Sequence, residues 1–110
     1  MLPKINRLKK KNDFGKVFKQ GQGFKQDFLY LKISKNNFGL SRFGFVISKK
    51  FSPKATERNR MRRRISELIR LRLPKIKKGI NAVIVVMPGA KSDFQKLEKI
   101  IDKLFEKAKL

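Results

Sequence analysis

Residues 57–65 constrain the fold of this chain more than any other segment, because they place five arginines in seven positions yet keep apolar residues at helical spacing. Met61 and Ile65 lie four residues apart, and Leu68 and Ile69 extend the same stripe, so we predict an amphipathic helix with one buried face. Arginine presents a planar fork of donors that matches phosphate oxygens, so the polar face suits a nucleic-acid backbone. The alternatives are a disordered basic tail, which the apolar spacing argues against, and an ordinary solvated helix face.

The net charge favours a polyanionic partner. The 110 residues include 30 Lys and Arg against 8 Asp and Glu, a formal charge of +22, which repels itself in a compact state unless a polyanion neutralises it. Because 40% of the residues are hydrophobic, the chain can still bury a core, and its length predicts one RNA-binding domain, residues 1–110. With no membrane span, no signal peptide and no Cys, we expect a cytoplasmic protein.

A basic leader that need not be ordered, residues 1–11, opens the chain. Asn12 or Asp13 can then cap a short helix that Gly21 ends. The apolar residues of this helix follow helical spacing: Phe14, Val17 and Phe18.

Two strands are predicted next, residues 27–34 and residues 42–48, with the turn-rich residues 35–39 between them. The second strand is expected to be antiparallel to the first. Alternation in the first strand places two sets of side chains on opposite faces, one with Leu29, Leu31 and Ile33 and the other with Phe28, Tyr30 and Lys32.

The arginine-rich helix is predicted to start at Ser52-Pro53, or at a later cap on Thr56, and to end near Leu73. Its exposed side is predicted to carry Asn59, Arg63, Ser66 and Arg70, flanked by Arg60 and Arg62.

Residues 80–87 form an almost continuous apolar run, which indicates a strand covered on both faces. Residues 92–95 resemble a capping box that opens a last helix. Its inward positions are Phe94, Leu97, Ile101, Leu104, Phe105 and Ala108. The order α-β-β-α-β-α, with room for one extra short strand, predicts a compact α+β domain with helices packed on a mixed central sheet.

Residues suited to catalysis are scarce. The chain has no His and no Cys, so it lacks the usual nucleophile–base pairs and zinc ligands. The acids of the last helix alternate with lysines, which favours salt-bridged surface over a metal site. We therefore predict no catalytic residue and no metal-binding residue in this chain.

The aromatic residues offer a second clue to function. Phe28, Tyr30 and Lys32 give one sheet face a mixed aromatic and basic character, and unpaired bases stack on such surfaces. The alternative is that a helix covers this face and the aromatics, with Phe14 and Phe18, belong to the core.

Three motifs in order resemble the bacterial ribonuclease P protein component over nearly the whole chain: residues 14–21 (FGKVFKQG), 44–50 (GFVISKK) and 58–63 (RNRMRR). The resemblance implies the small basic subunit of a ribonucleoprotein that removes the 5′ leader of precursor tRNA. In that enzyme the RNA subunit carries the catalysis and most of the Mg²⁺. The implied partners are ribonuclease P RNA and precursor tRNA, with no membrane and no obligate protein partner.

The resemblance also implies two surfaces and a left-handed β-α-β crossover, an exception to the usual right-handed rule. Docking on the catalytic RNA would involve Lys49, Lys50, Arg58, Asn59, Arg60, Arg62 and Arg63. The single-stranded leader would lie in a cleft formed by Phe14, Phe18, Phe28, Tyr30 and Lys32.

This chain departs from the family pattern at two positions, since members commonly have Arg where Ser66 stands and an apolar or small residue where Arg64 stands. The main rival hypothesis is a small basic ribosomal protein with a purely structural role on rRNA. Composition does not separate the two, but an aromatic cleft sized for one strand favours the processing enzyme.

Overall fold

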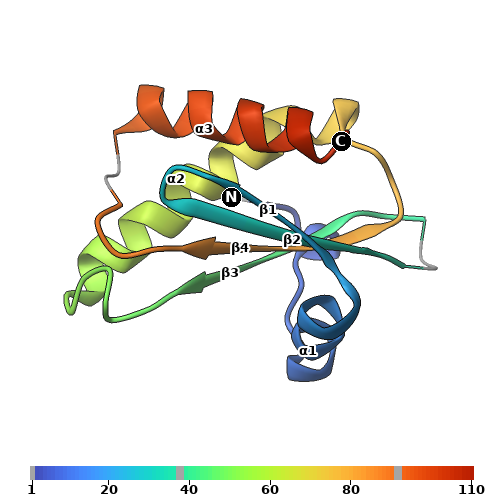
Figure 1. Ribbon diagram of the computed structural model, residues 1–110, viewed down its shortest axis with the longest axis horizontal. Helices are drawn as coiled ribbons and strands as arrows, with labels where there is room; N and C mark the ends of the chain where they lie inside the picture. The colour runs from blue at the N-terminus through green and yellow to red at the C-terminus, as the bar shows by residue number, and fades with distance from the viewer. Residues whose placement is uncertain (1, 37–38, 91–92) are drawn as a thin grey trace.

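The computed structural model describes residues 2–36, 39–90 and 93–110. They form three α-helices, a four-stranded sheet and two 3₁₀ turns, Lys4–Asn6 and Leu73–Lys75 (Figure 1). The elements in chain order are α1 Lys11–Gln20, β1 Gln22–Gln26, β2 Leu29–Lys35, β3 Arg42–Ile47, α2 Ala55–Arg72, β4 Ile80–Val86 and α3 Phe94–Lys107. The predicted α+β class is confirmed, and β1 is the extra short strand. Part of the predicted turn (residues 37–38) and the first residue of the predicted capping box (Ser92) lie outside the described residues.

The sheet has the order β1-β2-β4-β3. β1 and β2, and β2 and β4, are antiparallel, whereas β3 and β4 are parallel. The two strands predicted first, β2 and β3, do run in opposite directions, but β4 lies between them. Ile84 pairs with Leu31 on one side and with Phe45 on the other. The central place of β4 explains its apolar run, because this strand is covered on both faces.

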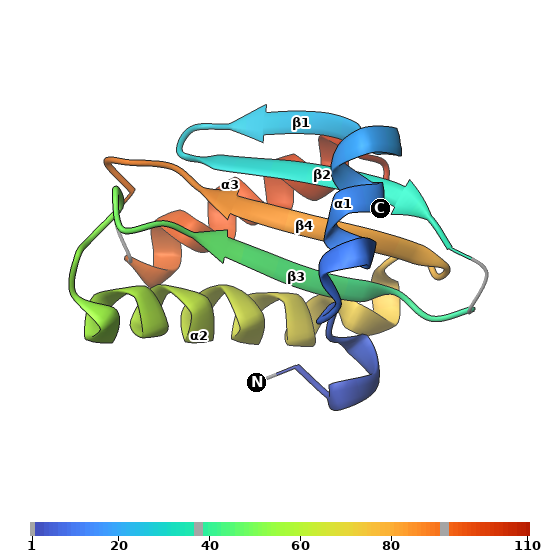
Figure 2. The same ribbon diagram turned by 90° about the horizontal axis from the view of Figure 1, so that it is seen from below.

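The connection from β3 through α2 to β4 is left-handed. Figure 2 shows the sheet with α1 in front and α2 behind it; β3 and β4 both point left, and β4 lies above β3. Seen from the α2 side with the strands pointing up, the chain therefore moves left from β3 to β4, whereas a right-handed crossover moves right.

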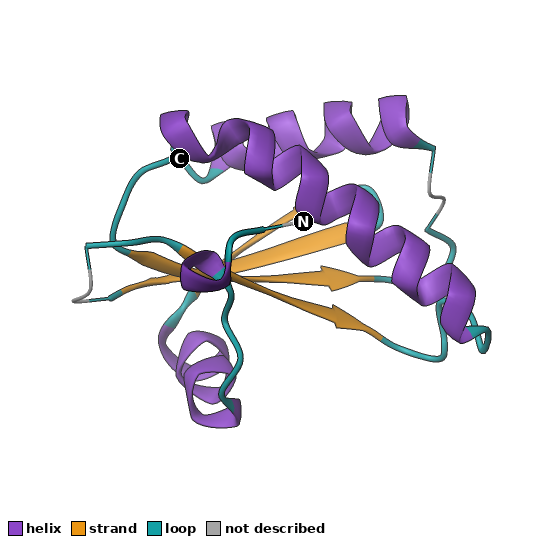
Figure 3. Cartoon of the chain, turned by 180° about the vertical axis from the view of Figure 1, so that it is seen from behind, coloured by secondary structure: helices purple, strands orange, loops and turns teal. Residues whose placement is uncertain are grey.

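Helices α2 and α3 cover one face of the sheet and α1 lies on the other (Figures 1 and 3). The predicted stripe of α2 is confirmed, since Met61, Ile65, Leu68 and Ile69 are all fully buried in the main core. On α3 the predicted inward residues Leu97, Ile101, Leu104 and Phe105 are buried and Ala108 is partly buried. The prediction that Phe94 points inward is wrong. Phe94 is the first residue of α3, at the edge of the buried face of the helix, and its side chain remains 39% exposed.

The helix starts differ from the predicted caps. The N-cap of α1 is Lys10, and the N-cap of α2 is Lys54; neither makes a side-chain capping bond. Asp13 instead pairs with Arg42 on β3. On α3 the cap is Asp93, one residue later than predicted, and its carboxylate accepts from the Gln95 and Lys96 amides. None of the described helices is long and apolar enough to cross a membrane.

The N-terminal segment, residues 2–8, packs beside β3. Leu2 and Leu8 are buried, and the Asn6 Nδ2 group donates to the Ser41 carbonyl oxygen at 2.7 Å. The Leu8 amide donates to the Phe43 carbonyl oxygen at 2.9 Å, so the segment pairs briefly with the β3 edge. The basic leader is thus held against the domain in this structure.

Candidate RNA-binding surfaces

The first candidate surface is the arginine face, formed by the N-terminal half of α2 and the loop before it. Asn59, Arg60 and Arg63 are exposed, while Arg58 and Arg62 are half-buried. All of these side chains lie away from the stripe that packs on α3 and the sheet. The face is therefore a rigid helical array of guanidinium groups.

Three hydrogen bonds orient parts of this face. Arg58 Nη1 donates to the Ser52 carbonyl oxygen at 2.8 Å, and the Ser52 hydroxyl donates to Glu57 Oε2 at 2.6 Å. Arg62 Nη1 donates to Asn59 Oδ1 at 3.0 Å, one turn away. Arg58 thus anchors the β3–α2 loop, and Asn59 positions the guanidinium of Arg62.

Lys49 and Lys50 lie in a tight turn after β3 and are exposed. The turn is held by Ser48, whose hydroxyl accepts from the Lys50 amide at 3.2 Å and whose carbonyl accepts from the Phe51 amide at 3.1 Å. The two lysines precede the positive end of the α2 dipole, which adds to their attraction for anions.

Ser66 does not belong to the exposed side of α2, contrary to the prediction. It is only 5% exposed and borders a pocket that residues of the N-terminal segment, β3 and α2 line together, so the buried arc of α2 is wider than predicted. The absence of a cation at this position therefore removes none from the exposed face. Asn59, Arg63 and Arg70 are exposed as predicted.

The second candidate surface is the α1 face of the sheet. Val17 is fully buried and packs with Leu8 and Val83 in a small second core. Phe14 is half-buried against this core, whereas Phe18 is 40% exposed. Val17, rather than the two phenylalanines, therefore anchors α1.

Two glycines allow aromatic rings to approach this side of the sheet closely. A Cβ atom at Gly44 would collide with the Phe14 ring, and a Cβ atom at Gly23 would collide with the Tyr30 ring. Lys32 shares the face with Tyr30, and its Nζ group donates to the Phe18 carbonyl oxygen at 2.6 Å, near the end of α1. Phe14, Phe18, Tyr30 and Lys32 thus border one surface beneath α1.

Phe28 does not lie with this group. It stands in the two-residue turn between β1 and β2 and packs against the main core, which belongs to the α2 and α3 side. The strand alternation that linked it to Tyr30 begins only at Leu29, because Asp27 has a φ of 52° and reverses the chain. The structure therefore removes Phe28 from the predicted cleft.

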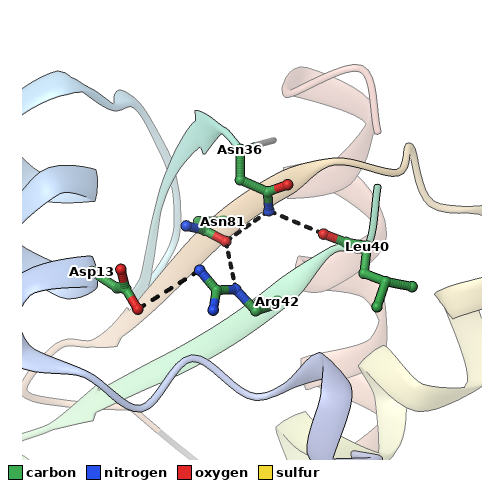
Figure 4. A network of polar contacts seen from close by, with 5 residues as sticks. All are labelled: Asp13, Asn36, Leu40, Arg42 and Asn81. Carbon is green, nitrogen blue, oxygen red and sulfur yellow. Dashed lines mark hydrogen bonds and ion pairs between the residues drawn. The ribbon is translucent and has the colours of Figure 1, made fainter. Parts of the chain in front are cut away.

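A polar network that was not predicted from the sequence joins α1 to the sheet (Figure 4). Asp13 of α1 lies 3.7 Å from Arg42 Nη2, and Arg42 Nε donates to Asn81 Oδ1 at 3.1 Å. Asn36 Nδ2 donates to the same Asn81 oxygen at 2.8 Å and to the Leu40 carbonyl oxygen at 3.0 Å. The register that places Arg42 opposite Asn81 depends on long-range pairing, so no local pattern signals this network.

Three acidic residues of α2 and α3 form ion pairs with arginines of α2. Arg72 Nε donates to Asp102 at 2.7 Å and Arg72 Nη2 lies 3.5 Å from Glu98, so an arginine of α2, rather than lysines of α3, pairs with these acids. The Arg70 guanidinium lowers the pKa of Glu67 to about 2. Within the described residues, no group of three or more acidic side chains could hold a metal ion.

These features define a class of protein, a basic α+β domain with an arginine face on one side of its sheet and a half-exposed aromatic face on the other. The chain belongs to the ribonuclease P protein family, since the family model described as Ribonuclease P matches residues 2–109. The family assignment sets aside the ribosomal-protein alternative.

Relatives with this description resemble the chain over most of their length. The chain is 37% identical to the ribonuclease P protein component of Pseudanabaena sp., covering 100% of this chain and 97% of the relative. It is 40% identical to the ribonuclease P protein component of Clostridioides difficile, and the match covers 91% of this chain and 89% of the relative. The structure of the RNase P protein from Thermotoga maritima is similar, with a TM-score of 0.82 and 29% identity. The match covers 92% of this chain and 96% of the Thermotoga chain. The Staphylococcus aureus RNase P protein shares the fold, with a TM-score of 0.85 and 23% identity. The match covers 94% of this chain and 95% of the Staphylococcus chain.

Proposed function

We propose that this chain is the protein subunit of a bacterial ribonuclease P. In this role it binds the catalytic RNA and the 5′ leader of precursor tRNA, and the RNA subunit cleaves the phosphodiester bond. The observation that carries the proposal is the pair of unlike surfaces on opposite faces of one sheet, the arginine face of α2 and the aromatic face beneath α1.

The arginine face is proposed to dock on the catalytic RNA. Arginine forks bind phosphate oxygens in pairs, and a face held on a rigid helix places several of them at fixed spacing. The residues assigned to this surface are Lys49, Lys50, Arg58, Asn59, Arg60, Arg62 and Arg63.

The aromatic face is proposed to hold the single-stranded leader. Phe18 is exposed enough to stack on a base, and the rings of Phe14 and Tyr30 lie close against the same side of the sheet. Lys32 supplies a cation at the end of α1. Phe28 is withdrawn from this surface because it packs against the other core.

Mg²⁺ is proposed to be bound mainly by the RNA subunit. The described acids are few, and Glu67, Glu98 and Asp102 are already paired with Arg70 and Arg72. This side-chain set does not fit a carboxylate cage for a divalent ion. The contribution of the protein is therefore cationic, because it offsets the repulsion between the phosphates of two RNAs.

Reconstitution tests the proposal. The purified protein is added to a bacterial ribonuclease P RNA at low Mg²⁺, and 5′ cleavage of precursor tRNA is measured. We expect cleavage only when both components are present, since the protein offers no His or Cys for acid–base or nucleophilic chemistry. Cleavage by carefully purified protein without RNA would contradict the division of labour, and no stimulation of the RNA would contradict the function.

A further inference from the structure

A groove of about 380 Å³ runs along the edge of β3, between the N-terminal segment and α2. It lies between the two surfaces assigned above and shares one residue with each, Arg62 with the arginine face and Phe14 with the aromatic face. Its lining combines apolar side chains, among them Leu8, Phe14 and Phe45, with the cations Arg7, Lys9 and Arg62. None of the described residues that line it is acidic.

The groove exists because the N-terminal segment leaves β3 early. Arg7 bridges to Phe43, and the Leu8 amide donates to the Phe43 carbonyl, after which the chain turns into α1 at Lys11. β3 is an edge strand, so no described strand lies beside Phe45 on this side. The Phe43 carbonyl points away from β4, towards Leu8. Backbone groups two residues apart point the same way in a strand, so the N–H and C=O of Phe45 also point away from β4 and face the groove.

Small residues keep the groove open. Gly44 leaves room for the Phe14 ring at the base, and Ser66 presents a short side chain on the α2 wall. Ser66 also lines a second hollow of about 240 Å³, with Asn59, Arg62 and Arg63. The groove therefore adjoins this hollow on the arginine face, and Arg62 and Ser66 border both.

We infer that this groove binds one unpaired nucleotide of an RNA partner, with its base against the apolar wall and its phosphate beside Lys9 and Arg62. A base has two apolar faces and a polar edge, which match the rings of Phe14 and Phe45 and the backbone groups of the β3 edge. Three cations and no acid match a phosphate and would not suit an apolar ligand. The volume lies near the lower end of the range for small-ligand sites, about 300–1,000 Å³, so it takes one nucleotide rather than several.

The test uses the isolated full-length protein and its amide NMR spectrum, so its outcome is separate from the reconstitution of cleavage. The protein is titrated with AMP and, in parallel, with ribose 5-phosphate, a matched probe without a base. We expect AMP to shift the amide signals of Leu8, Gly44, Phe45 and Ser66 and to bind about 5- to 150-fold more tightly than ribose 5-phosphate, the value of one stacked base.

Two variants locate the site. Ser66→Leu fills the α2 wall without changing any charge, and it is expected to reduce AMP affinity to that of ribose 5-phosphate. Phe18→Ala, on the aromatic face beneath α1, is the matched control and should leave the groove shifts unchanged. Thermal melts show whether Ser66→Leu is folded. If it is not, the inference is judged on the unmodified protein alone, from the amide signals that AMP shifts and from its affinities for AMP and ribose 5-phosphate. Equal affinity for the two probes, or AMP shifts centred on Phe18 and Tyr30 instead, would overturn the inference.

Discussion

Replacing Arg63 by Ala should change the salt dependence of RNA binding in a calculable way. Arg63 is exposed on α2, and its side chain has no hydrogen-bond or ion-pair partner among the described residues, so it can contact a phosphate without breaking a contact within the protein. Each phosphate contact contributes about 0.7–0.9 to the slope of log K against log salt, because one contact releases about that many counterions. When the salt concentration rises about fourfold, both proteins lose RNA affinity. The factor by which the variant loses affinity should be about threefold smaller than the factor for the unmodified protein.

The measurement is equilibrium binding of labelled ribonuclease P RNA over a series of salt concentrations. Arg70→Ala is the matched control, since Arg70 lies on the same helix and is exposed but donates to Glu67, with Nε 3.0 Å from Oε2. We expect the Arg70→Ala slope to match that of the unmodified protein. The reasoning is refuted if Arg63→Ala keeps the full slope while remaining folded, or if Arg70→Ala flattens it equally.

Three further predictions concern stability and the second surface. Phe18→Ala should leave the melting temperature nearly unchanged but cost about 1–3 kcal/mol of precursor binding in saturated holoenzyme, with mature tRNA binding as before; equal loss of both would show that the aromatic face is misassigned. Val17→Ala should instead destabilise the fold by about 2 kcal/mol, which thermal or urea melts measure, because Val17 is fully buried. The free protein should gain stability from sulfate or phosphate, which offset its +22 charge; a melting temperature that ignores both anions contradicts this.

A pH prediction follows from Glu67, whose pKa is lowered from 4.5 to about 2 by Arg70. Its folded-state pKa lies below the unfolded value, so the Arg70 pair is complete above pH 4.5 and is lost only as the pH falls towards 2. A carboxyl NMR titration checks the value, and in Arg70→Ala the midpoint should return towards 4.5. A midpoint near 4.5 in the unmodified protein would mean that the pair does not form in solution.

The sequence predicted those features of the fold that depend on local periodicity. The buried stripe of α2 and the apolar run of β4 were predictable because a repeat of 3.6 residues and a continuous apolar strand each indicate which side is covered. Ser66 was placed wrongly because it borders a pocket shared with the N-terminal segment, about sixty positions earlier in the chain. Local periodicity shows which residues are apolar, but it does not show which distant segment packs against a polar one.

The errors around β1 and β2 have a similar cause. A strand predicted from Asp27 places Phe28 on the face of Tyr30, whereas the chain turns at Asp27 and β2 begins at Leu29. A start two residues later excludes Phe28 from the alternation, and its ring packs against the main core. The sheet order is equally non-local, since β4 separates the two strands that precede it in the chain.

The handedness of the β3-α2-β4 connection determines whether the two candidate surfaces lie on opposite faces of the sheet or compete for one face. With β3 and β4 parallel and adjacent, handedness alone decides which face of the sheet receives α2. A right-handed connection between the same strands would place this helix of 18 residues on the face that α1 occupies. It would then compete with α1, which has only 10 residues, for the surface around Val83 and Tyr30 and would cover the aromatics proposed to hold the leader. The left-handed connection places α2 beside α3 instead. The arginine face and the aromatic face therefore lie on opposite sides of one sheet, and the edge strand β3, with its groove, lies between them.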